Sequence, residues 1–538
     1  MTTNVSVAIV GAGPVGVTAA NLLGTYGVDT LIVDRETTVI EYPRAVGVDD
    51  EALRTFQAAG LSAEILRDTI ANVPMKLFDA AGRCLADIRP TGRDLGWYRR
   101  NIFMQPLAEA TLRRGLARFP HVRLMLGTEM RELSQDGSGV TLRLAGEDGE
   151  VHEVRADYVI AADGGRSPIR TQLGIPLEGS THARKWVVID CANDPLDAPY
   201  TALHCDPRRP YVCAHMPYDH RRWEFMLFPG EDADENLTRE RIDALLRHHL
   251  DDPGKVDVIR ARVYTHHSRI AARFVDGRVA LAGDAAHLMP PWAGQGMNTG
   301  FRDVTNLCWK LAAVVKGHAD RSLLTTYDQE RRPHAQAMIE LSTRLGQILS
   351  PTRRSVARAR DWLLRAAAVA PPVKRWTVEM RFKPIPDYRD GFTVPDGPGR
   401  WLPTAGRMLP QPDVETADGA RVRLDDVLGS WFAVVGFECD PLGGLNAAEL
   451  AVLERFRPRI IKIIESRAGE RYHRQPCVDA KTVVVEDVDN QLRPWFQARR
   501  HDVVLVRPDR YVAAMTTPQR LGTALSRLAR AFTGGAPS

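Results

Sequence analysis

The sequence predicts an α/β protein with three parts: a Rossmann-type dinucleotide-binding domain, a β-sheet domain interleaved with it, and a C-terminal thioredoxin-like α/β domain. Three observations support this prediction. A glycine fingerprint follows an apolar strand near the N-terminus, two further strand-and-turn motifs occur far along the chain, and a new strand and helix pattern begins near residue 431. Since single hydrophobic cores stop growing near roughly 250 to 300 residues, a chain of 538 residues is expected to form two or three domains.

The first motif begins with an apolar strand over 5–10, which runs directly into the turn Gly11-Ala-Gly13-Pro-Val-Gly16 and a helix over 17–26. Gly11 allows the tight turn, Gly13 lets a pyrophosphate approach the backbone, and Gly16 lets the helix pack closely on the strand. The phosphates are expected at the helix N-terminus, where unpaired N–H groups and the helix dipole favour anions.

A second strand, over 30–33, ends in Asp34 about twenty residues after the glycines, and Arg35 follows it. A carboxylate at this position can accept a hydrogen bond from a ribose hydroxyl group. Both residues are therefore candidate cofactor contacts. The fingerprint predicts a bound dinucleotide, but it does not distinguish FAD from NAD.

Two later motifs bear on that choice. A buried strand ends in Asp163-Gly164, with Ser167 and Arg170 at fixed offsets, and a second apolar strand ends in Gly283-Asp284. A proline turn and the glycine-rich segment 294–300 follow the second strand, before a helix predicted over 301–315. Segment 294–300 is either a flexible loop or the start of that helix, in which case its N–H groups can face a flavin ring and stabilise negative charge on it.

These three motifs, at these separations, resemble the family of single-component FAD aromatic hydroxylases, which includes the para-hydroxybenzoate and phenol hydroxylases. The resemblance implies contacts with FAD for the following residues: Gly11, Gly13, Gly16, Asp34, Arg44, Gln105, Asp163, Gly164, Gly283 and Asp284. From the glycine-rich segment we add Gly296, Met297 and Asn298.

A closer likeness within the family is to bacterial hydroxylases of phenolic acids that carry a propionate or acrylate side chain, and it covers almost the whole chain. The segments that carry this likeness are 42–55, 99–101, 225–226, 262–266, 380–383 and 506–510.

The family resemblance implies non-covalent FAD, with NADH and dioxygen as co-substrates. The expected reaction is ortho-hydroxylation of a phenolic acid in aromatic catabolism, through a flavin C4a-hydroperoxide in a pocket that excludes water. Because no second glycine fingerprint follows a strand, NADH is expected to bind transiently, without a domain of its own. The alternatives are a hydroxylase of another phenol such as phenol, resorcinol or a polyketide ring, a thiol-redox protein, and a flavoprotein that only binds its cofactor.

Four residues are the candidate catalytic residues and are expected to contact the substrate. Tyr264 and His266 alternate on a predicted strand and so point to one face of a sheet, which is expected to line the pocket. Asp49 matches a position where phenol hydroxylases place an acid near the substrate hydroxyl, although a helix N-cap explains it almost as well. Pro290 lies in the proline turn, whereas His287, just before it, is expected to be structural.

A substrate carboxylate favours an arginine, because the planar guanidinium group can bind it with two hydrogen bonds. Arg99, Arg100 and Arg184 are the candidates, and the sequence does not choose among them.

The predicted domains follow from the placement of these motifs. The FAD-binding domain comprises 1–75, 100–177 and 268–345, the substrate-binding sheet comprises 76–99 and 178–267, a helical connection covers 346–392, and the C-terminal domain covers 393–538. The connection contains a basic stretch, 353–381, with apolar residues at helical spacing. A helix docked on the catalytic domain is favoured over a membrane-surface helix.

The C-terminal domain is expected to contain a strand over 431–437, a helix over 447–464 and strands over 482–485 and 503–506. This order predicts a thioredoxin-like fold. Cys439 lies where such a fold carries its redox pair, but the next cysteine is Cys477, so no CxxC pair exists and a structural or dimer-contact role is expected.

Composition excludes several other classes. The net charge of +4 and the lack of a long basic run argue against a nucleic-acid partner. Seven scattered cysteines without CxxC spacing indicate neither a disulfide framework nor a metal site, and favour a reducing, cytoplasmic location. No apolar run reaches the length of about 18 residues needed to span a membrane. A homodimer is one possible assembly.

Overall fold

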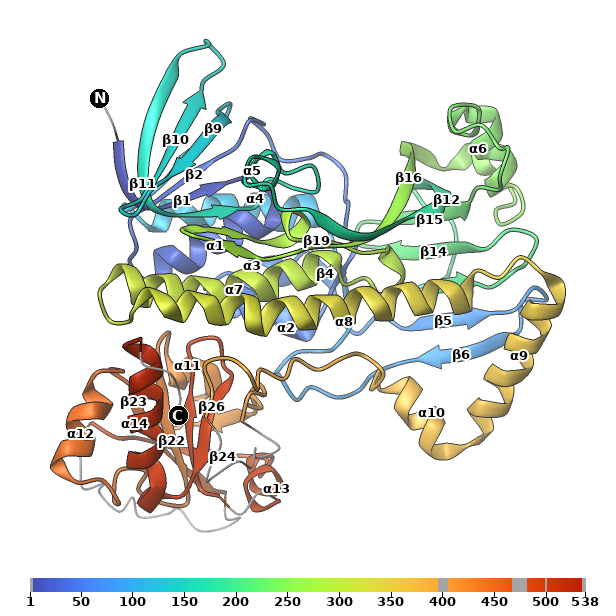
Figure 1. Cartoon of the computed structure of the whole chain (residues 1–538). Coiled ribbons are helices and arrows are strands. Elements are labelled where there is room, and N and C mark those ends of the chain that lie inside the picture. The colour runs from blue at the N-terminus through green and yellow to red at the C-terminus, as the bar shows by residue number, and fades with distance from the viewer. Residues whose placement is uncertain (1–2, 395–404, 467–480, 499–500, 535–538) are drawn as a thin grey trace.

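The structure, a computed structural model, describes residues 3–394, 405–466, 481–498 and 501–534 (Figure 1). Its first sheet has the strand order β17-β18-β11-β1-β2-β8, and β10 and β9 extend it beside β11. Strand β1 pairs in parallel with β11 on one side and β2 on the other, so the carboxyl ends of these strands meet at one edge. The strands are β1 Thr3–Val10, β2 Thr30–Val33, β8 Val122–Met125, β9 Glu129–Gln135, β10 Val140–Ala145, β11 Val151–Ala161, β17 Val275–Asp276 and β18 Val279–Leu281.

Helices cover this sheet, as a Rossmann-type fold requires. Most residues of the two helices α1 and α7 are buried. The helices of this part are α1 Pro14–Thr25, α2 Asp50–Ala58, α3 Ser62–Leu66, α4 Gln105–Gly115, α5 Pro168–Gln172, α7 Gly296–Val315 and α8 Thr325–Leu349. The expected strands and helix α1 are present to within a few residues. Helix α7 begins five residues before the predicted position, so the second half of the glycine-rich segment forms its first turn.

The second sheet, of order β19-β16-β12-β15-β14-β13-β5-β6, lies beside the first in Figure 1. Its strands are β5 Met75–Phe78, β6 Cys84–Ile88, β12 Leu177–Ala192, β13 Thr201–His204, β14 Tyr211–Met216, β15 His220–Met226, β16 Asp257–Ala271 and β19 His287–Leu288. Because side chains alternate along each strand, one face packs Val187, Trp223 and Phe225 against α6 Arg239–Leu246, and the other face is left for a ligand. A small third sheet, β3 Gly47–Val48, β7 Asn101–Phe103 and β4 Thr69–Ile70, completes this region.

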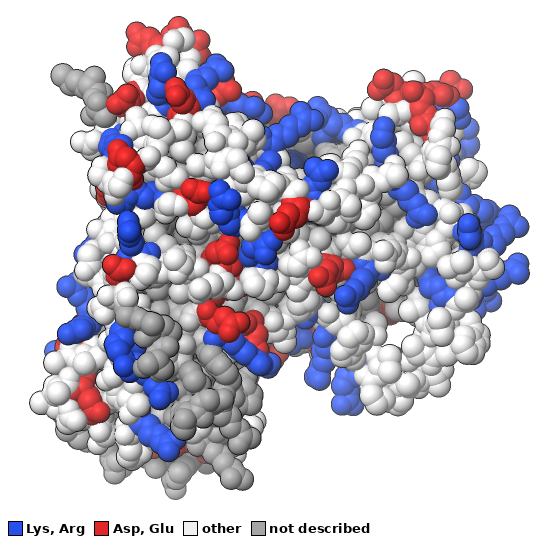
Figure 2. All heavy atoms as spheres, in the orientation of Figure 1, with Lys and Arg blue, Asp and Glu red and all other residues white. Residues whose placement is uncertain are grey.

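The basic stretch forms α9 Arg354–Val369 and α10 Pro371–Val378, which project from the body in Figure 1. Leu364 packs with β6 residues in an apolar cluster, so the stretch docks on the substrate-sheet domain as favoured from the sequence. Its outer side leaves Trp362 and Trp376 exposed, and Figure 2 shows Lys and Arg side chains gathered around these two helices. In the described part of the chain, none of the helices has the length and apolar character needed to cross a membrane.

The C-terminal domain contains a seven-stranded sheet of order β21-β20-β24-β23-β22-β25-β26. Strands β22 and β23 are parallel, β25 pairs antiparallel with β22 and β26 pairs antiparallel with β25. Helix α14 Leu521–Phe532 follows, which is a thioredoxin-like arrangement. The strands are β20 Asp413–Glu415, β21 Arg421–Arg423, β22 Ala433–Phe437, β23 Arg459–Glu465, β24 Val483–Asp487, β25 Val503–Val506 and β26 Val512–Thr516.

One element of this domain was predicted wrongly. The helix expected over 447–464 ends at Glu454, as α12 Ala447–Glu454, and its second half is strand β23. Arg457 has a φ of +48° and Pro458 follows it, so the helix cannot continue, and the isoleucine-rich run beyond prefers a buried strand. Burial raises the pKa of the Cys439 thiol to about 11, which suits a structural rather than a redox role. Cys477 and the linker residues 395–404 lie outside the described residues.

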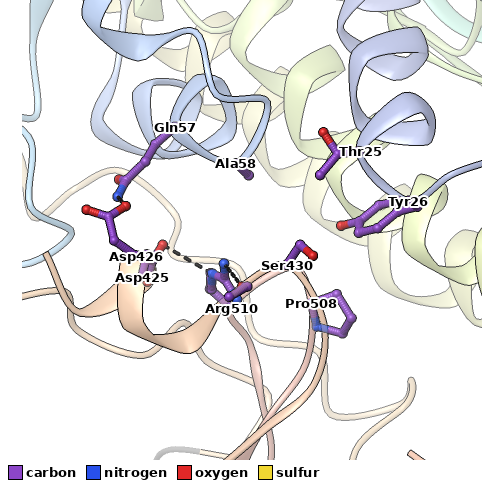
Figure 3. A pocket seen from close by; sticks show the side chains of 10 residues that line it. Thr25, Tyr26, Gln57, Ala58, Asp425, Asp426, Ser430, Pro508 and Arg510 are labelled. Carbon is purple, nitrogen blue, oxygen red and sulfur yellow. Dashed lines mark hydrogen bonds and ion pairs between the residues drawn. The ribbon is translucent and has the colours of Figure 1, made fainter. Parts of the chain in front are cut away.

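The C-terminal domain is joined to the rest by a continuous core. Trp309 of α7 packs edge-on against Phe432 at 5.5 Å, and Tyr26 packs against Trp431 at 5.7 Å. A cavity of about 180 Å³ at this seam (Figure 3) is crossed by structural contacts, because Arg510 binds Asp425 at 3.2 Å. None of the predicted site residues lines it, so we place the functional site elsewhere.

Candidate active site

A second cavity, of about 490 Å³, lies between the carboxyl edge of the first sheet and the free face of the second. Its walls come from segments far apart in the sequence. They include the turn after β1, the segment 44–49, the face of the second sheet, the segment 288–298 and residues 380–383. Most of the predicted site residues meet here, so this cavity is the candidate active site.

The glycine turn after β1 forms one end of the cavity. Gly11 has a φ of +104°, and a Cβ there would lie 2.3 Å from the carbonyl oxygen of Ala162, so no other residue fits. Gly16 packs against the carbonyl of Gly11 in the same way. A Cβ on Gly13 would meet no atom within 4 Å, which leaves an open cradle at the N-terminus of α1. The cradle suits an anionic pyrophosphate.

Asp34 and Arg35 behave differently from each other. The Asp34 carboxylate accepts hydrogen bonds from the N–H groups of Ala12, at 2.6 Å, and Glu36, at 2.9 Å, and so holds the glycine turn in place. Arg35 is exposed and pairs with Glu36 at 3.1 Å. Neither residue lines the cavity, so their contacts with the adenosine half of a dinucleotide stay predictions.

Asp163 and Gly164 follow β11 next to the same turn. One Asp163 oxygen accepts from the Ile169 N–H group at 3.1 Å, but the other is buried without a hydrogen-bond partner. Burial raises the pKa of this carboxyl group. A buried acceptor left unpaired by the protein suits a ligand that brings a hydroxyl donor.

The segment around Arg44 is fixed from both sides. The Gln105 amide oxygen accepts from the N–H groups of Arg44 and Ala45, at 3.0 and 2.6 Å. The Arg44 guanidinium group pairs with Asp284 at 3.3 Å, across the cavity mouth. Asp284 follows Gly283 at the end of β18, as the sequence predicts, and it lines the cavity with a partly exposed carboxylate.

Helix α7 points its N-terminus at the cavity, where Gly296 and Met297 form part of the wall. The Asn298 side chain is committed to the protein. It donates to the carbonyl groups of Gly294, at 2.7 Å, and Gly47, at 3.1 Å, and it accepts from the Asp49 N–H group at 3.2 Å. Asn298 therefore ties the start of α7 to the segment before α2, which shapes the cavity.

His287 is structural, as expected. It is buried and pairs with Asp303 at 2.7 Å, and the same Asp303 oxygen accepts from the Gly283 N–H group at 3.0 Å. Arg331 contacts the other Asp303 oxygen at 3.0 Å. Asp303 thus holds the turn that presents Asp284, a supporting role that the sequence motif alone did not reveal.

Three observations test whether this cavity fits FAD. The cradle at Gly13 is open, and the N-termini of two helices, α1 and α7, border one cavity. Asp163 does not itself line the cavity, but it lies next to Gly164, which does, and it has a buried oxygen without a hydrogen-bond partner. A dinucleotide with two phosphates, ribityl hydroxyls and an electron-accepting ring offers complementary groups at each place. The residues present therefore fit FAD.

The glycine turn allows a direct test of this placement. Gly13→Ala is expected to leave the midpoint of thermal unfolding unchanged and to weaken FAD binding by about tenfold, or about 1.4 kcal/mol, because the methyl group fills the cradle. Titration of apoprotein with FAD, followed by flavin fluorescence, measures this affinity. Gly11→Ala is the contrast, since its Cβ would clash with Ala162 and lower the unfolding midpoint itself. Unchanged FAD affinity in Gly13→Ala would contradict the placement.

Tyr264 and His266 both line the opposite wall, and so do Thr265 and His267, so the strict alternation used in the sequence prediction does not hold here. The Tyr264 hydroxyl accepts from Arg260 at 2.6 Å. His266 stacks on Trp186 with ring centroids 5.9 Å apart, and burial lowers its pKa to about 4, so it is neutral near pH 7. A neutral ring stacked on an indole provides an aromatic wall. A catalytic role for either residue stays a prediction.

Asp49 lines the cavity and also caps helix α2, where it accepts from the Ala52 N–H group at 3.0 Å. Burial raises its pKa, but the adjacent Arg302 and Lys383 cations more than offset this and lower it below the ordinary value. Lys383 lies 2.8 Å away and Arg302 pairs with it closely. Asp49 is thus an ionised member of a buried charge cluster, and its contact with a substrate stays a prediction.

Pro290 and Arg184 do not reach the cavity. Pro290 is buried and does not line the cavity, whereas its neighbours Met289 and Pro291 do. Arg184 instead donates to the Ser350 carbonyl at 2.8 Å. The predicted contacts of Pro290 and Arg184 with the substrate are therefore not supported by their positions.

Arg99 and Arg100 both line the cavity, but their partners differ. Arg99 pairs with Asp94 at 2.6 Å. Arg100 donates only to neutral oxygens: the carbonyl of Val73 at 2.5 Å, that of Pro74 at 3.2 Å and the Thr201 hydroxyl at 2.7 Å. Burial lowers the pKa of Arg100 to about 10, so it is still a cation near pH 7. It has no anionic partner among the described residues.

Two cavity residues were missed from the sequence, Arg222 and Glu224 of β15. They alternate with Trp223 and Phe225, which face the apolar core. Charged residues at every second position of an otherwise aromatic strand are the signal that could have revealed them.

Comparisons with known proteins agree with this geometry. A family model described as an FAD binding domain matches residues 4–342, and a model described as the HcaD C-terminal domain matches residues 406–531. The chain is 54% identical over 511 residues to the 3-(3-hydroxy-phenyl)propionate/3-hydroxycinnamic acid hydroxylase 2 of Burkholderia vietnamiensis, covering 95% of this chain and 93% of that one. It is 44% identical to an Escherichia coli hydroxylase of the same description, covering 98% and 95% of the two chains.

Solved structures share the fold over the whole chain. The flavin-dependent monooxygenase PieE, solved with FAD and substrate, aligns with a TM-score of 0.78 at 24% identity and covers 98% of this chain and 99% of its own. The OxyS anhydrotetracycline hydroxylase from Streptomyces rimosus aligns with a TM-score of 0.75 at 25% identity over 100% of both chains.

Proposed function

The chain belongs to the family of FAD-dependent monooxygenases whose FAD binding domain it carries, and from that premise we propose that it hydroxylates 3-(3-hydroxyphenyl)propionate to 3-(2,3-dihydroxyphenyl)propionate. 3-Hydroxycinnamate is expected to react in the same way. The co-substrates are NADH and dioxygen. The relatives named for these two acids support the substrate, since they are 44 to 54% identical over nearly the whole chain.

The observation that carries this proposal is Arg100. Its guanidinium group lines the cavity as a cation without an anionic partner among the described residues, held in place by Thr201 and two backbone carbonyls. A buried cation is unfavourable unless a ligand neutralises it, and a carboxylate matches guanidinium geometry best. A phenol without a carboxylate would leave Arg100 unpaired. This favours a phenolic acid over phenol, resorcinol or a polyketide ring.

The other residues of the cavity complete the binding site. Val188 and Val212 provide apolar surface on the second sheet, and His266 and Trp292 provide an aromatic wall. Together they exclude water from the ring to be hydroxylated. When bound, FAD supplies the activation of dioxygen and the transfer of one oxygen atom to the ring. The chain contributes orientation through Arg100 and a dry surface around the reacting carbon.

Product analysis tests the proposed function. Protein loaded with FAD is incubated with NADH, ¹⁸O₂ and 3-(3-hydroxyphenyl)propionate, and the product is identified by mass spectrometry. One ¹⁸O atom in 3-(2,3-dihydroxyphenyl)propionate is expected, with phenol and resorcinol reacting much more slowly. NADH oxidation that yields only hydrogen peroxide with every phenol would argue for a flavoprotein without hydroxylase turnover. A cytoplasmic location and a homodimeric assembly belong to the same proposal as predictions from the sequence.

A further inference from the structure

Glu224 is an ionisable residue of the cavity that has no partner in the protein. It lies on β15 and lines the cavity from the second sheet. Within the described residues it takes part in no hydrogen bond or salt bridge, although the other carboxylates of the cavity wall are engaged: Asp49 with Arg302 and Lys383, and Asp284 with Arg44. A carboxylate placed here without a protein donor requires another source of hydrogen bonds.

The strands on either side cannot supply a donor. Glu224 lies opposite Val212 of β14 and opposite Val188 of β12, and both of these aliphatic residues face the same cavity. The carboxyl group is therefore flanked by apolar side chains across the sheet. Its surroundings on this wall favour a ligand that brings a donor of its own.

The nearest cation along β15, Arg222, is already fully engaged. Its guanidinium group binds Asp190 through two nitrogens, at 2.7 and 3.1 Å, and donates to the backbone carbonyl of Arg44 at 2.7 Å and to that of Pro43. Arg222 therefore anchors the segment that carries Arg44. It lowers the electrostatic cost of a charge on Glu224 without forming a hydrogen bond to it.

We propose that Glu224 accepts the hydrogen bond of the substrate's phenolic hydroxyl group and takes up its proton as the ring is hydroxylated. This inference rests on the proposed function. An ionised phenolic acid offers one donor, the phenolic O–H, and one strong acceptor, the carboxylate. The cavity offers the matching pair, since Arg100 can only donate and ionised Glu224 can only accept.

The spacing of the two groups agrees with one bound molecule. Arg100 is bonded to Thr201 of β13, which lies two strands away from β15 in the sheet, and Thr201 faces the same cavity as Glu224. Strands are about 4.8 Å apart, so the two positions are separated by roughly 10 Å or slightly more. Their side chains, reaching into the cavity, can hold the two ends of an arylpropionate between them.

The proton transfer balances. The phenolic O–H bond breaks, a Glu224 O–H bond forms, and the electron pair left on oxygen raises the electron density of the ortho carbon. This carbon would then form a C–O bond to the oxygen atom that bound FAD and dioxygen supply, as the O–O bond breaks and its electron pair stays on the oxygen left behind. When the hydroxylated carbon loses its hydrogen as a proton to solvent, aromaticity returns and Glu224 gives its proton back to the original oxygen. Burial raises the pKa of Glu224, with Arg222 opposing and Asp190 adding to the shift, which makes its carboxylate a stronger base.

The test compares wild type, Glu224→Gln and Glu224→Asp, each loaded with FAD. Glu178→Gln is the control, an exposed glutamate of the same sheet that pairs with Arg332 outside the cavity. The readouts are FAD content, the dissociation constant of 3-(3-hydroxyphenyl)propionate, NADH oxidation and the amount of hydroxylated product. Glu224→Gln is expected to retain FAD, to bind substrate within a fewfold of wild type and to form product about a hundredfold more slowly, with hydrogen peroxide in place of product. Glu224→Asp should recover part of the rate.

A second substrate separates proton transfer from a structural role. Ring fluorination makes the phenolic hydroxyl more acidic, so the deficit of Glu224→Gln should shrink with a fluorinated 3-(3-hydroxyphenyl)propionate. Equal product formation by Glu224→Gln and wild type would overturn the inference alone, as would an equal deficit with both substrates. Glu224→Gln could instead slow the reduction of FAD by NADH while the fraction of NADH used to form product stays unchanged. That result would also overturn the inference, and would assign Glu224 to the binding of NADH. A wild-type protein that forms no hydroxylated product would overturn the proposed function and this inference together.

Discussion

Arg100→Met is expected to lower kcat/KM for 3-(3-hydroxyphenyl)propionate by about a hundredfold or more, while FAD binding stays unchanged. Removing one partner of a desolvated, charge-assisted pair costs about 2 to 5 kcal/mol, and each factor of ten in rate corresponds to about 1.4 kcal/mol. Most of the loss should appear in KM, because the carboxylate is bound in the same way before and during the reaction. Steady-state kinetics with product quantification measures both parameters.

Two comparisons make this prediction specific to the carboxylate. The preference of wild type for the acid over its primary amide should disappear in Arg100→Met, because the amide carries no charge. Arg184→Met, which removes a cation outside the cavity, should change kcat/KM by less than about threefold. If Arg99→Met abolished the preference for the acid and Arg100→Met did not, the carboxylate would have to be reassigned to Arg99.

The parts of the site that local motifs define could be predicted from the sequence. The turn with Gly11 and Gly13, Asp163 after β11 and Asp284 after β18 are short segments whose backbone geometry follows from a strand that ends in glycine. Their meeting at one cavity follows from parallel strands, whose carboxyl ends share an edge. Neither step needs knowledge of distant side chains.

The part of the cavity proposed to bind the substrate could be predicted only in part, because it depends on contacts between segments that are distant in the sequence. Three arginines looked equivalent in the sequence, and only the structure shows that Arg99 is paired with Asp94, that Arg184 is turned toward Ser350, and that Arg100 lacks an acid. The alternation of Glu224 with Trp223 and Phe225 could have placed it on the cavity face, but nothing in the local sequence shows that it lacks a partner. Asp49 satisfied both expectations, a helix cap and a cavity residue, so the sequence could not choose between them.

The predicted boundaries of two elements were wrong, because tertiary packing there overrides the local preference of the sequence for helix or loop. The run Arg459–Glu465 contains apolar residues that fit either a buried helix or a buried strand, and only its pairing with β22 decides for the strand. The start of α7 at Gly296 is also set from a distance, since the Asn298 side chain ties that first turn to Gly47 and Asp49. Glycine-rich sequence alone suggests a loop there.

The C-terminal domain supports the active site through a buried charge network. Arg507, in the turn after β25, binds Glu330 of α8 through two hydrogen bonds of 2.6 and 2.8 Å and also pairs with Asp509 at 2.6 Å. Asp509 in turn accepts from Trp309 of α7 at 3.1 Å, and Lys310 of α7 binds Glu330 at 2.7 Å. The same helix α7 forms part of the cavity wall at its N-terminus, so the domain stabilises an element that borders the candidate active site.

Arg507→Met is therefore expected to reduce the free energy of unfolding by about 3 to 5 kcal/mol, because it leaves Glu330 and Asp509 buried without their main cation. The fully buried positions of these groups exclude water as a replacement partner. Urea unfolding followed by tryptophan fluorescence and by release of FAD measures the effect, and both signals should shift together, since the network joins the domain to α7. Arg143→Ala, which removes an exposed pair with Glu132, is the control and should change stability by less than about 1 kcal/mol. If the Arg507→Met variant lost tryptophan signal at low urea while FAD release stayed at the wild-type midpoint, the C-terminal domain would unfold independently and would not support the flavin site.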